Sequence, residues 1–216
     1  MSYDRQEALR YFGAREPNQA TEKLLDTVYA SLQPFLQPKY CYSKFSCAVD
    51  ARQGTVILDT RVVLHSKHLA RHLKSCREVF LFGATLGSAA DVALRRLTVS
   101  SVAQGAAAQA ICAAVIESYC NASCRAIGQT LPQGQLLLPR FSPGYGDWSL
   151  EEQKQVCALL DCAHRIGLTL TDSLMLAPLK SVTALIGITT EAQCALPQCA
   201  LCTKTDCEFR RSEGNK

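Results

Sequence analysis

Residues 78–87 read EVFLFGATLG, an apolar run that ends in a turn containing two glycines, Gly83 and Gly87. The run has the length and composition of a buried strand, and a helix is predicted to begin after it at about Ser88. A strand, a turn and a helix start in this order present backbone N–H groups at the beginning of the helix. The dinucleotide-binding pattern G-x-G-x-x-G is not formed by these two glycines. We therefore interpret residues 78–87 as a strand-to-helix corner.

The segments around this corner are predicted to mix helices with short strands. Upstream, the patterning predicts helices over residues 4–12, 18–36 and 66–74, and β-rich runs over 39–49, 55–58 and 61–64. Downstream, it predicts a long Ala-rich helix over 98–129 broken only at Gly105, an extended segment over 131–143, a helix over 149–166 and strands over 168–176 and 181–189. A capping box of Ser149 and Glu152 opens the 149–166 helix, and Gly167 ends it.

Composition excludes several classes of protein. The 216 residues are 48% hydrophobic and 19% charged, which is typical of a folded globular chain and not of a disordered one. The net charge of +4 comes from scattered basic residues, so nucleic-acid binding is disfavoured. The longest apolar run, residues 102–115, is interrupted by polar residues, so no membrane span is predicted. The polar N-terminus lacks an export signal, and we expect a cytoplasmic protein.

The twelve cysteines fall into two groups. Eight are dispersed through patterned segments, where a free cysteine commonly serves as a small buried hydrophobe. The other four follow the last patterned segment in the spacing C-x4-C-x2-C-x4-C, at Cys194, Cys199, Cys202 and Cys207. We therefore predict a folded domain over residues 1–190 and a cysteine-rich tail over 191–216.

Two features stand out as candidates for function. The loop over residues 140–149, RFSPGYGDWS, places turn signals around an arginine, a tyrosine and the only tryptophan, a composition more typical of functional than of structural loops. Glu117 lies among apolar residues of the long helix, where a carboxylate is costly unless it is paired. From the sequence alone, a solvent-facing position is the simpler interpretation of Glu117.

Several motifs in fixed order resemble the activation domain of cobalamin-dependent methionine synthase. Arg140, Gly144 and Tyr145 fit an R-x-x-x-G-Y loop, and a helix separates them from IGLTLTDS at residues 166–173 and from Pro178 and SV at residues 181–182. The resemblance covers most of residues 1–190, and the chain looks like a free-standing form of that domain. It implies an α+β fold with a twisted, mainly antiparallel sheet flanked by helices.

The resemblance implies S-adenosylmethionine binding and reactivation of cobalamin. Inert Co(II) cobalamin is recovered by one electron and a methyl group from S-adenosylmethionine, a reaction that needs proximity and orientation and no general base. The sequence contains no cobalamin-binding D-x-H-x-x-G motif. We therefore expect a component of a methyltransferase, with the cobalamin carried by a methionine synthase subunit or another corrinoid protein, and with an electron donor as a further partner.

The resemblance also implies roles for four residues. Arg140 would hold the carboxylate of the ligand in a bidentate pair. Tyr145 would line the ligand or the corrin face, and Gly144 would allow close backbone approach. Glu117 corresponds less closely to a helix carboxylate that pairs with the cationic end of S-adenosylmethionine. Gly134 stands where the family has a second carboxylate.

The four tail cysteines depart from the family pattern and indicate a metal centre. Cys194, Cys199, Cys202 and Cys207 could surround one metal, and an iron–sulfur cluster accepts such compact spacing better than structural zinc does. Zinc and plain thiols stay open as alternatives. A cluster here would supply the electron that reactivation needs. The competing hypothesis is a non-catalytic zinc- or iron–sulfur-containing module that docks onto a corrinoid protein or transfers electrons to it.

Overall fold

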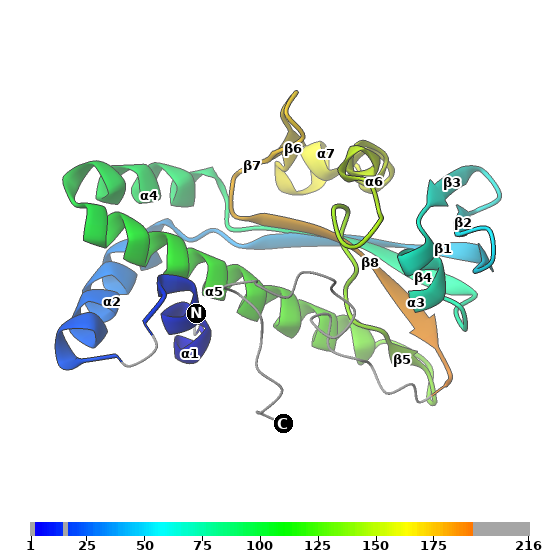
Figure 1. The fold of residues 1–216 in the computed structure, drawn as a ribbon, viewed down its shortest axis with the longest axis horizontal. Helices are drawn as coiled ribbons and strands as arrows, with labels where there is room; N and C mark the ends of the chain where they lie inside the picture. Colours follow the sequence, from blue (N-terminus) through cyan, green and yellow to red (C-terminus); the bar gives the residue numbers. More distant parts are fainter. Residues whose placement is uncertain (1–2, 15–16, 192–216) are drawn as a thin grey trace.

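A computed structural model describes residues 3–14 and 17–191 and shows a six-stranded antiparallel sheet with helices on both faces (Figure 1). The helices are α1 (Arg5–Phe12), α2 (Gln19–Leu32), α3 (Lys67–His72), α4 (Ser88–Ser100), α5 (Val102–Gly128), α6 (Gln153–Leu160) and α7 (Cys162–Ile166). The strands are β1 (Lys39–Asp50), β2 (Thr55–Leu58), β3 (Val62–His65), β4 (Glu78–Thr85), β5 (Leu136–Leu137), β6 (Thr169–Leu170), β7 (Leu176–Ala177) and β8 (Ser181–Thr189).

The predicted strand over residues 78–87 lies at the centre of the sheet. Its six strands are ordered β3-β2-β1-β4-β8-β5, and all neighbouring pairs are antiparallel. Strand β4 pairs with β1 on one side and with β8 on the other, and its Gly83 lies opposite Cys41 of β1 and Thr183 of β8. The separate strands β6 and β7 form a small hairpin. The α+β class with a mainly antiparallel sheet is confirmed.

Alternate residues of β4 contribute to two hydrophobic cores. Phe80 and Phe82 face the helices α2, α4 and α5, together with Ile186 of β8. Val79 and Leu81 face the opposite side, where α3, α6 and α7 pack around the buried Trp148. Because side chains alternate along a strand, a strand buried on both faces must be apolar at consecutive positions. This explains why residues 79–84 read as a continuous apolar run.

The long helix differs from the prediction at its beginning. Ser101 has extended backbone angles, so residues 98–100 belong to α4, and α5 begins at Val102. The hydroxyl of Ser101 accepts the backbone N–H of Gln104 and caps the new helix. Gly105 does not break α5; a Cβ at this position would lie 2.8 Å from the Cα of Thr98, so the glycine permits the close approach of α4 and α5.

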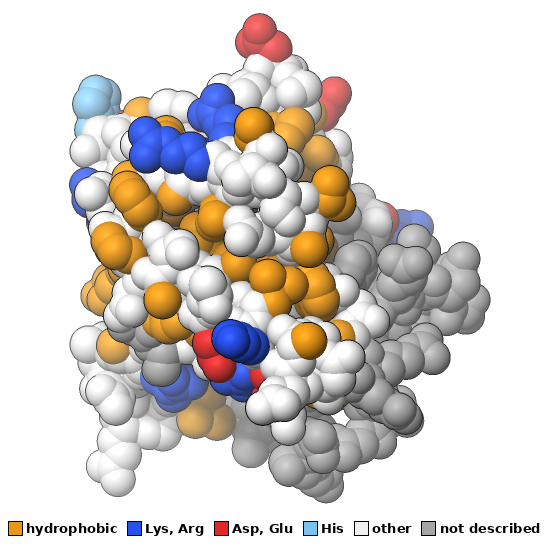
Figure 2. Space-filling model, turned by 90° about the vertical axis from the view of Figure 1, so that its left-hand side faces the viewer, with side chains coloured by type: hydrophobic (Ala, Val, Ile, Leu, Met, Phe, Trp, Pro, Cys, Tyr) orange, Lys and Arg blue, Asp and Glu red, His pale blue; other side chains and the backbone are white. Residues whose placement is uncertain are grey.

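The corner between α4 and α5 is exposed to solvent. Val99 and Val102 are 89% and 87% exposed, so the apolar run over residues 102–115 becomes buried only after its first turn. Figure 2 shows the end of the molecule where α2 and α4 lie, with hydrophobic side chains exposed between small groups of charged ones. The long helix is therefore exposed at its first residues and buried where it packs on the sheet.

Two further differences concern the helix predicted over residues 149–166. The capping box does not form: Ser149 accepts an N–H from Glu151, whereas Glu152 accepts the indole N–H of Trp148 at 2.6 Å and the backbone N–H of His65 at 3.0 Å. The carboxylate of Glu152 thus accepts a hydrogen bond from the indole N–H of the buried Trp148 and does not cap the helix. Asp161 adopts a left-handed conformation, φ 50°, and divides the segment into α6 and α7. Gly167 ends α7 as predicted.

The dispersed cysteines are free thiols, as expected. Cys41, Cys76, Cys112, Cys120 and Cys162 are buried, while Cys47, Cys124 and Cys157 are partly exposed. The four tail cysteines lie outside the described residues, as does all of the predicted tail except Glu191. Within residues 3–14 and 17–191, no helix combines the length and the hydropathy needed to cross a membrane.

The loop over residues 140–149 is anchored to α3 by Asp147. Its carboxylate accepts hydrogen bonds from the hydroxyl of Ser66 and from the backbone N–H groups of Lys67 and His68. These two N–H groups belong to the first turn of α3 and have no hydrogen-bond partner within the helix. Burial opposes ionisation, but these hydrogen bonds outweigh it and lower the pKa of Asp147 to about 2. The preceding Gly146 has φ 57°, and a Cβ there would lie 2.3 Å from Nδ1 of His68.

Replacing Asp147 with Asn should therefore destabilise the fold in a pH-dependent way. At neutral pH we expect a loss of about 1 kcal/mol, the usual value of a helix cap, because the neutral amide is a weaker acceptor than the carboxylate. The stability that the lowered pKa provides is complete above the ordinary value of 3.8 and is lost as the pH falls through about 2. Urea unfolding of both proteins should show that the difference in their free energies of unfolding shrinks as the pH is lowered from 3.8 to about 2. Asp172→Asn, at an exposed position, should show no such dependence, and equal stabilities at neutral pH would contradict the anchoring role.

Candidate functional site

The loop arginine predicted from the sequence reaches across to the long helix. Nη2 of Arg140 lies 2.7 Å from Oε2 of Glu117, and Nη1 lies 2.9 Å from Oδ1 of Asn121. Sγ of Cys124 is 3.7 Å from Nη1. The three acceptors are spaced four and three residues apart, so they share one face of α5. The structure thus brings together two of the predicted site residues, Arg140 and Glu117.

The backbone on either side of Arg140 directs its side chain toward α5. Leu138 and Phe141 hydrogen-bond to Gly187 and Leu185 of β8, so residues 136–141 continue along the edge of the sheet. Phe141 packs into the core on the α6 side together with Trp148. Since side chains alternate along an extended segment, Arg140 points to the other face, where α5 lies.

The pair between Arg140 and Glu117 is half-buried. The side chains are 16% and 30% exposed, respectively. Burial disfavours a charged guanidinium, but the nearby Cys120 and Glu117 outweigh this and raise the pKa of Arg140. Arg140 is therefore a permanent cation at the edge of the helix. Glu117 does not face solvent alone, and the simpler interpretation made from its sequence context is wrong.

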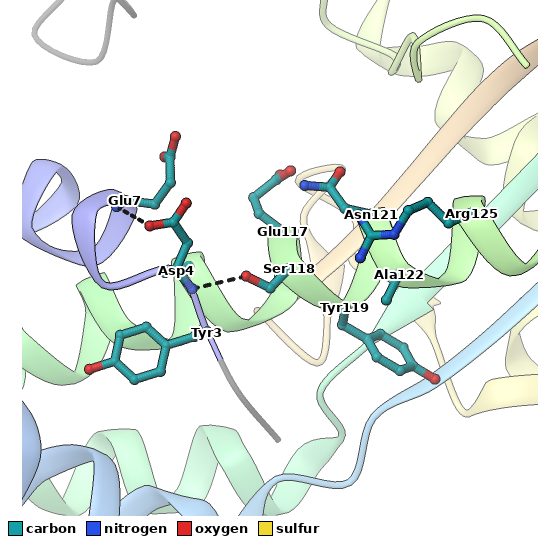
Figure 3. Close-up of a pocket in the computed structure, with 10 residues that line it drawn as sticks. Tyr3, Asp4, Glu7, Glu117, Ser118, Tyr119, Asn121, Ala122 and Arg125 are labelled. Carbon is teal, nitrogen blue, oxygen red and sulfur yellow. Dashed lines mark hydrogen bonds between the residues drawn. The ribbon is translucent and has the colours of Figure 1, made fainter. Parts of the chain in front are cut away.

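An open groove of about 770 Å³ lies beside this pair, between α1 and α5. Figure 3 shows Asp4 and Glu7 on the α1 side and Glu117 and Asn121 on the α5 side. A hydrogen bond joins the two sides of the groove: the backbone N–H of Asp4 donates to Oγ of Ser118 at 3.2 Å. The remaining lining residues are Tyr3, Ala114, Tyr119, Ala122 and Arg125. The groove is polar and rich in carboxylates, and the Arg140 pair borders it through Glu117 and Asn121.

The aromatic residue of the predicted motif, Tyr145, lies in the same loop as Arg140. Tyr145 is 45% exposed and packs edge-on against Phe141, with ring centroids 6.1 Å apart. Burial of its hydroxyl raises the pKa of Tyr145, and the charge of Glu117 adds to the shift. Tyr145 therefore lies within electrostatic range of the Arg140 pair. Its ring is partly exposed to solvent.

Two glycines have structural explanations. Gly144 has φ 89°, and its N–H donates to the carbonyl of Trp148 at 2.8 Å, so the turn of the loop requires a glycine there. Gly134, which stands in place of a family carboxylate, also has a positive φ, and a Cβ there would meet no other atom. The turn therefore accounts for Gly144 without a ligand.

Sequence reasoning missed several residues of this site. Asn121 and Cys124 could have been found from their helical spacing to Glu117, but only after Arg140 had been placed opposite them. Asp4 and Glu7 could not have been found, because nothing in the sequence indicates that α1 packs against α5. No group of three or more His, Cys, Asp or Glu side chains within the described ranges has the geometry of a metal site.

Comparisons with known proteins agree with these observations. The family model for the activation domain of vitamin B12 dependent methionine synthase matches residues 129–205, less than half of the chain but including Arg140, Gly144 and Tyr145. Among solved structures, the crystal structure of the MetH reactivation domain bound to AdoHcy superposes with a TM-score of 0.61. This chain has the fold of the MetH reactivation domain. The match covers 89% of this chain and 72% of that domain at 13% sequence identity.

The reactivation-domain fold extends well beyond the region that the family model recognises. The structural match includes most of the chain, whereas the family model begins at residue 129, after α5. No curated protein sequence matches the chain. At 13% identity the superposition establishes the fold alone.

Proposed function

We propose that this protein binds S-adenosylmethionine at the Arg140 site and supports reductive methylation of Co(II) cobalamin on a methionine synthase subunit or a related corrinoid partner. The observation that carries the proposal is the meeting of Arg140 and Glu117, 23 residues apart in the chain, beside an open groove. The motif match over residues 129–205 and the fold support it.

The charge arrangement suits the amino-acid end of S-adenosylmethionine. That end carries a carboxylate and an ammonium group on the α-carbon, and two methylene groups separate the α-carbon from the sulfonium. A ligand carboxylate would replace or join Glu117 at the guanidinium of Arg140, and the ligand cations would take the place of Arg140 beside Glu117. Because each charge finds a new opposite partner, the exchange avoids leaving a half-buried charge unpaired.

The groove adds further features to this proposed site. Asp4 and Glu7 give the α1 side of the groove carboxylates, which favour a ligand with net positive charge, although Glu7 is also paired with Arg10. Tyr145 presents an exposed ring beside the pair, a surface that suits an adenine ring or the corrin of a docked partner. No residue in the site needs to act as a base, since methyl transfer from a sulfonium depends on alignment and exclusion of water.

Binding of S-adenosylmethionine tests the ligand assignment. Arg140→Ala should weaken affinity by about ten- to a hundredfold, because it removes a charge-assisted pair worth roughly 1.5–3 kcal/mol. Glu117→Gln should weaken affinity less, since the amide keeps a hydrogen-bond acceptor but loses the charge. Isothermal titration calorimetry of each variant measures this directly.

The matched control is Arg96→Ala, which removes an exposed arginine of α4 outside the groove. Its affinity for S-adenosylmethionine should equal that of the unchanged protein. Near-ultraviolet circular dichroism establishes that each variant is folded. Unchanged affinity in a folded Arg140→Ala protein would refute the ligand assignment.

Reactivation is tested with a separately purified corrinoid protein in the Co(II) state. The mixture contains a chemical reductant and S-adenosylmethionine labelled in its methyl group, and methylcobalamin is followed by its visible spectrum and by label. Addition of this protein should raise the rate of methylation, and Arg140→Ala should lower that gain at ligand concentrations below saturation. An equal rate with and without the protein would contradict the reactivation role.

The cysteine-rich tail is a separate part of the proposal. We expect Cys194, Cys199, Cys202 and Cys207 to bind one oxygen-sensitive iron–sulfur cluster that passes the electron to cobalt, with a bound zinc as the alternative. Compact cysteine spacing and a reaction that needs single electrons support this. The family model extends to residue 205 and so includes three of the four cysteines.

Metal analysis of the full chain after anaerobic purification tests the tail. Iron and acid-labile sulfide should be present in stoichiometric amounts, with broad visible absorption that bleaches in air. Replacing all four tail cysteines with Ser should abolish the colour while S-adenosylmethionine binding is retained. Stoichiometric zinc without iron or sulfide would exclude the cluster and favour the docking module.

A further inference from the structure

The segment that carries Arg140 contains one residue more than the neighbouring strand β8 can pair with. At the end of β5 the register is regular, and the N–H of Leu138 donates to the carbonyl of Gly187 at 2.9 Å. A regular ladder would continue by placing Arg140 opposite Leu185. Leu185 instead pairs with Phe141, and each donates its N–H to the carbonyl of the other, at 2.8 and 2.9 Å. The register therefore shifts by one residue, which defines a β-bulge at Arg140 and the residue before it.

This bulge decides which face of the sheet Arg140 points to. Residues directly opposite each other on neighbouring strands share a face, and Leu185 belongs to the core on the α6 side. In a regular ladder the guanidinium of Arg140 would therefore be directed into that apolar core. With the bulge, Phe141 takes the place beside Leu185, and Arg140 extends to Glu117 on α5.

His72, the last residue of α3, contacts both neighbours of Arg140 in the bulge. Its Nε2 lies 2.9 Å from the carbonyl oxygen of Pro139, the preceding residue. Its ring packs against Phe141, the following residue, with ring centroids 5.4 Å apart. A bulge takes backbone groups out of the ladder. Pro139 has no N–H to leave unpaired, and its carbonyl receives a hydrogen bond from His72.

The imidazole of His72 is suited to this contact. A carbonyl oxygen only accepts hydrogen bonds, so Nε2 must carry a proton. Burial lowers the pKa of His72, which keeps the ring neutral near pH 7 with that proton on Nε2. The helix that carries the ring is itself fixed, because Leu69 and Leu73 are buried in the same core as Phe141. Asp147 of the same loop binds the other end of α3.

We propose that His72 is a positioning residue for the Arg140 site. By donating to the carbonyl of Pro139 it stabilises the bulge, and the bulge directs the guanidinium of Arg140 toward Glu117 and the groove. The inference rests on the proposed function, in which Arg140 binds the carboxylate of S-adenosylmethionine. His72 acts on the ligand only through the backbone that carries Arg140.

Two substitutions separate the hydrogen bond from the ring contact. His72→Phe keeps an aromatic ring beside Phe141 but removes the donor, whereas His72→Gln keeps an N–H donor at about the distance of Nε2. His72→Phe should weaken affinity for S-adenosylmethionine by roughly two- to tenfold, the effect of losing one hydrogen bond, and His72→Gln should recover most of it. The matched control is His65→Phe, at an exposed position of β3, which should bind like the unchanged protein.

A second measurement, by NMR spectroscopy, does not depend on the ligand. The amide of Phe141, which donates to Leu185, should exchange with solvent faster in His72→Phe than in the unchanged protein. The side-chain Nε–H signal of Arg140, assigned by its loss in Arg140→Lys, should shift in His72→Phe. Both should return toward their original values in His72→Gln. Unchanged exchange of the β4 amides establishes that the variants are folded.

The outcomes separate the positioning role from the proposed function. The positioning role is overturned if His72→Phe leaves both the Phe141 exchange rate and the Arg140 signal unchanged. It is also overturned if a folded His72→Gln protein behaves like His72→Phe, because the donor would then be irrelevant. Absence of S-adenosylmethionine binding by the unchanged protein would refute the proposed function, and the two NMR readouts would then decide the role of His72 by themselves.

Discussion

Burial of β4 on both faces is the constraint on which the rest of the structure depends. A strand of this kind needs an apolar layer on each side, and the chain supplies α2, α4 and α5 for one face and α3, α6 and α7 for the other. The antiparallel neighbours β1 and β8 satisfy its backbone hydrogen bonds. Each layer then carries a different group of polar side chains. The ion pair of Arg140 and Glu117 lies on the α5 side, and the buried thiols of Cys41 and Cys162 lie on the other.

The sequence predicts most elements of this fold because their patterns are local. The apolar run at residues 78–87, the strand at residues 181–189 and the start of the helix at residue 18 each depend on a few neighbouring residues. The failures occur where tertiary contacts decide. Ser101 separates two helices that helix propensity alone would join, and Glu152 bonds to Trp148 and His65 instead of closing a capping box. At Asp161, a non-glycine residue adopts a left-handed conformation that composition does not indicate.

The candidate site was predictable only in part, for a similar reason. The loop around Arg140 is recognisable from its own composition and motif, and Glu117 stands out as a carboxylate among apolar residues. Neither feature shows that the two meet, since their contact requires the edge strand to place Arg140 over one face of α5. The α1 side of the groove depends on the packing of two helices about a hundred residues apart in the chain, which local patterns do not report.

The loop that carries Arg140 depends on both layers of the molecule at once. Phe141 and Trp148 pack into the core beneath α6, and Asp147 caps α3, so the ends of the loop are fixed on one side of the sheet. Arg140 leaves the same segment toward the other side and pairs with α5. A half-buried ion pair has little net stability to contribute, because desolvation offsets much of its attraction. Its orientation is therefore maintained by the apolar packing of its neighbours, which holds the guanidinium beside Glu117 at the edge of the groove.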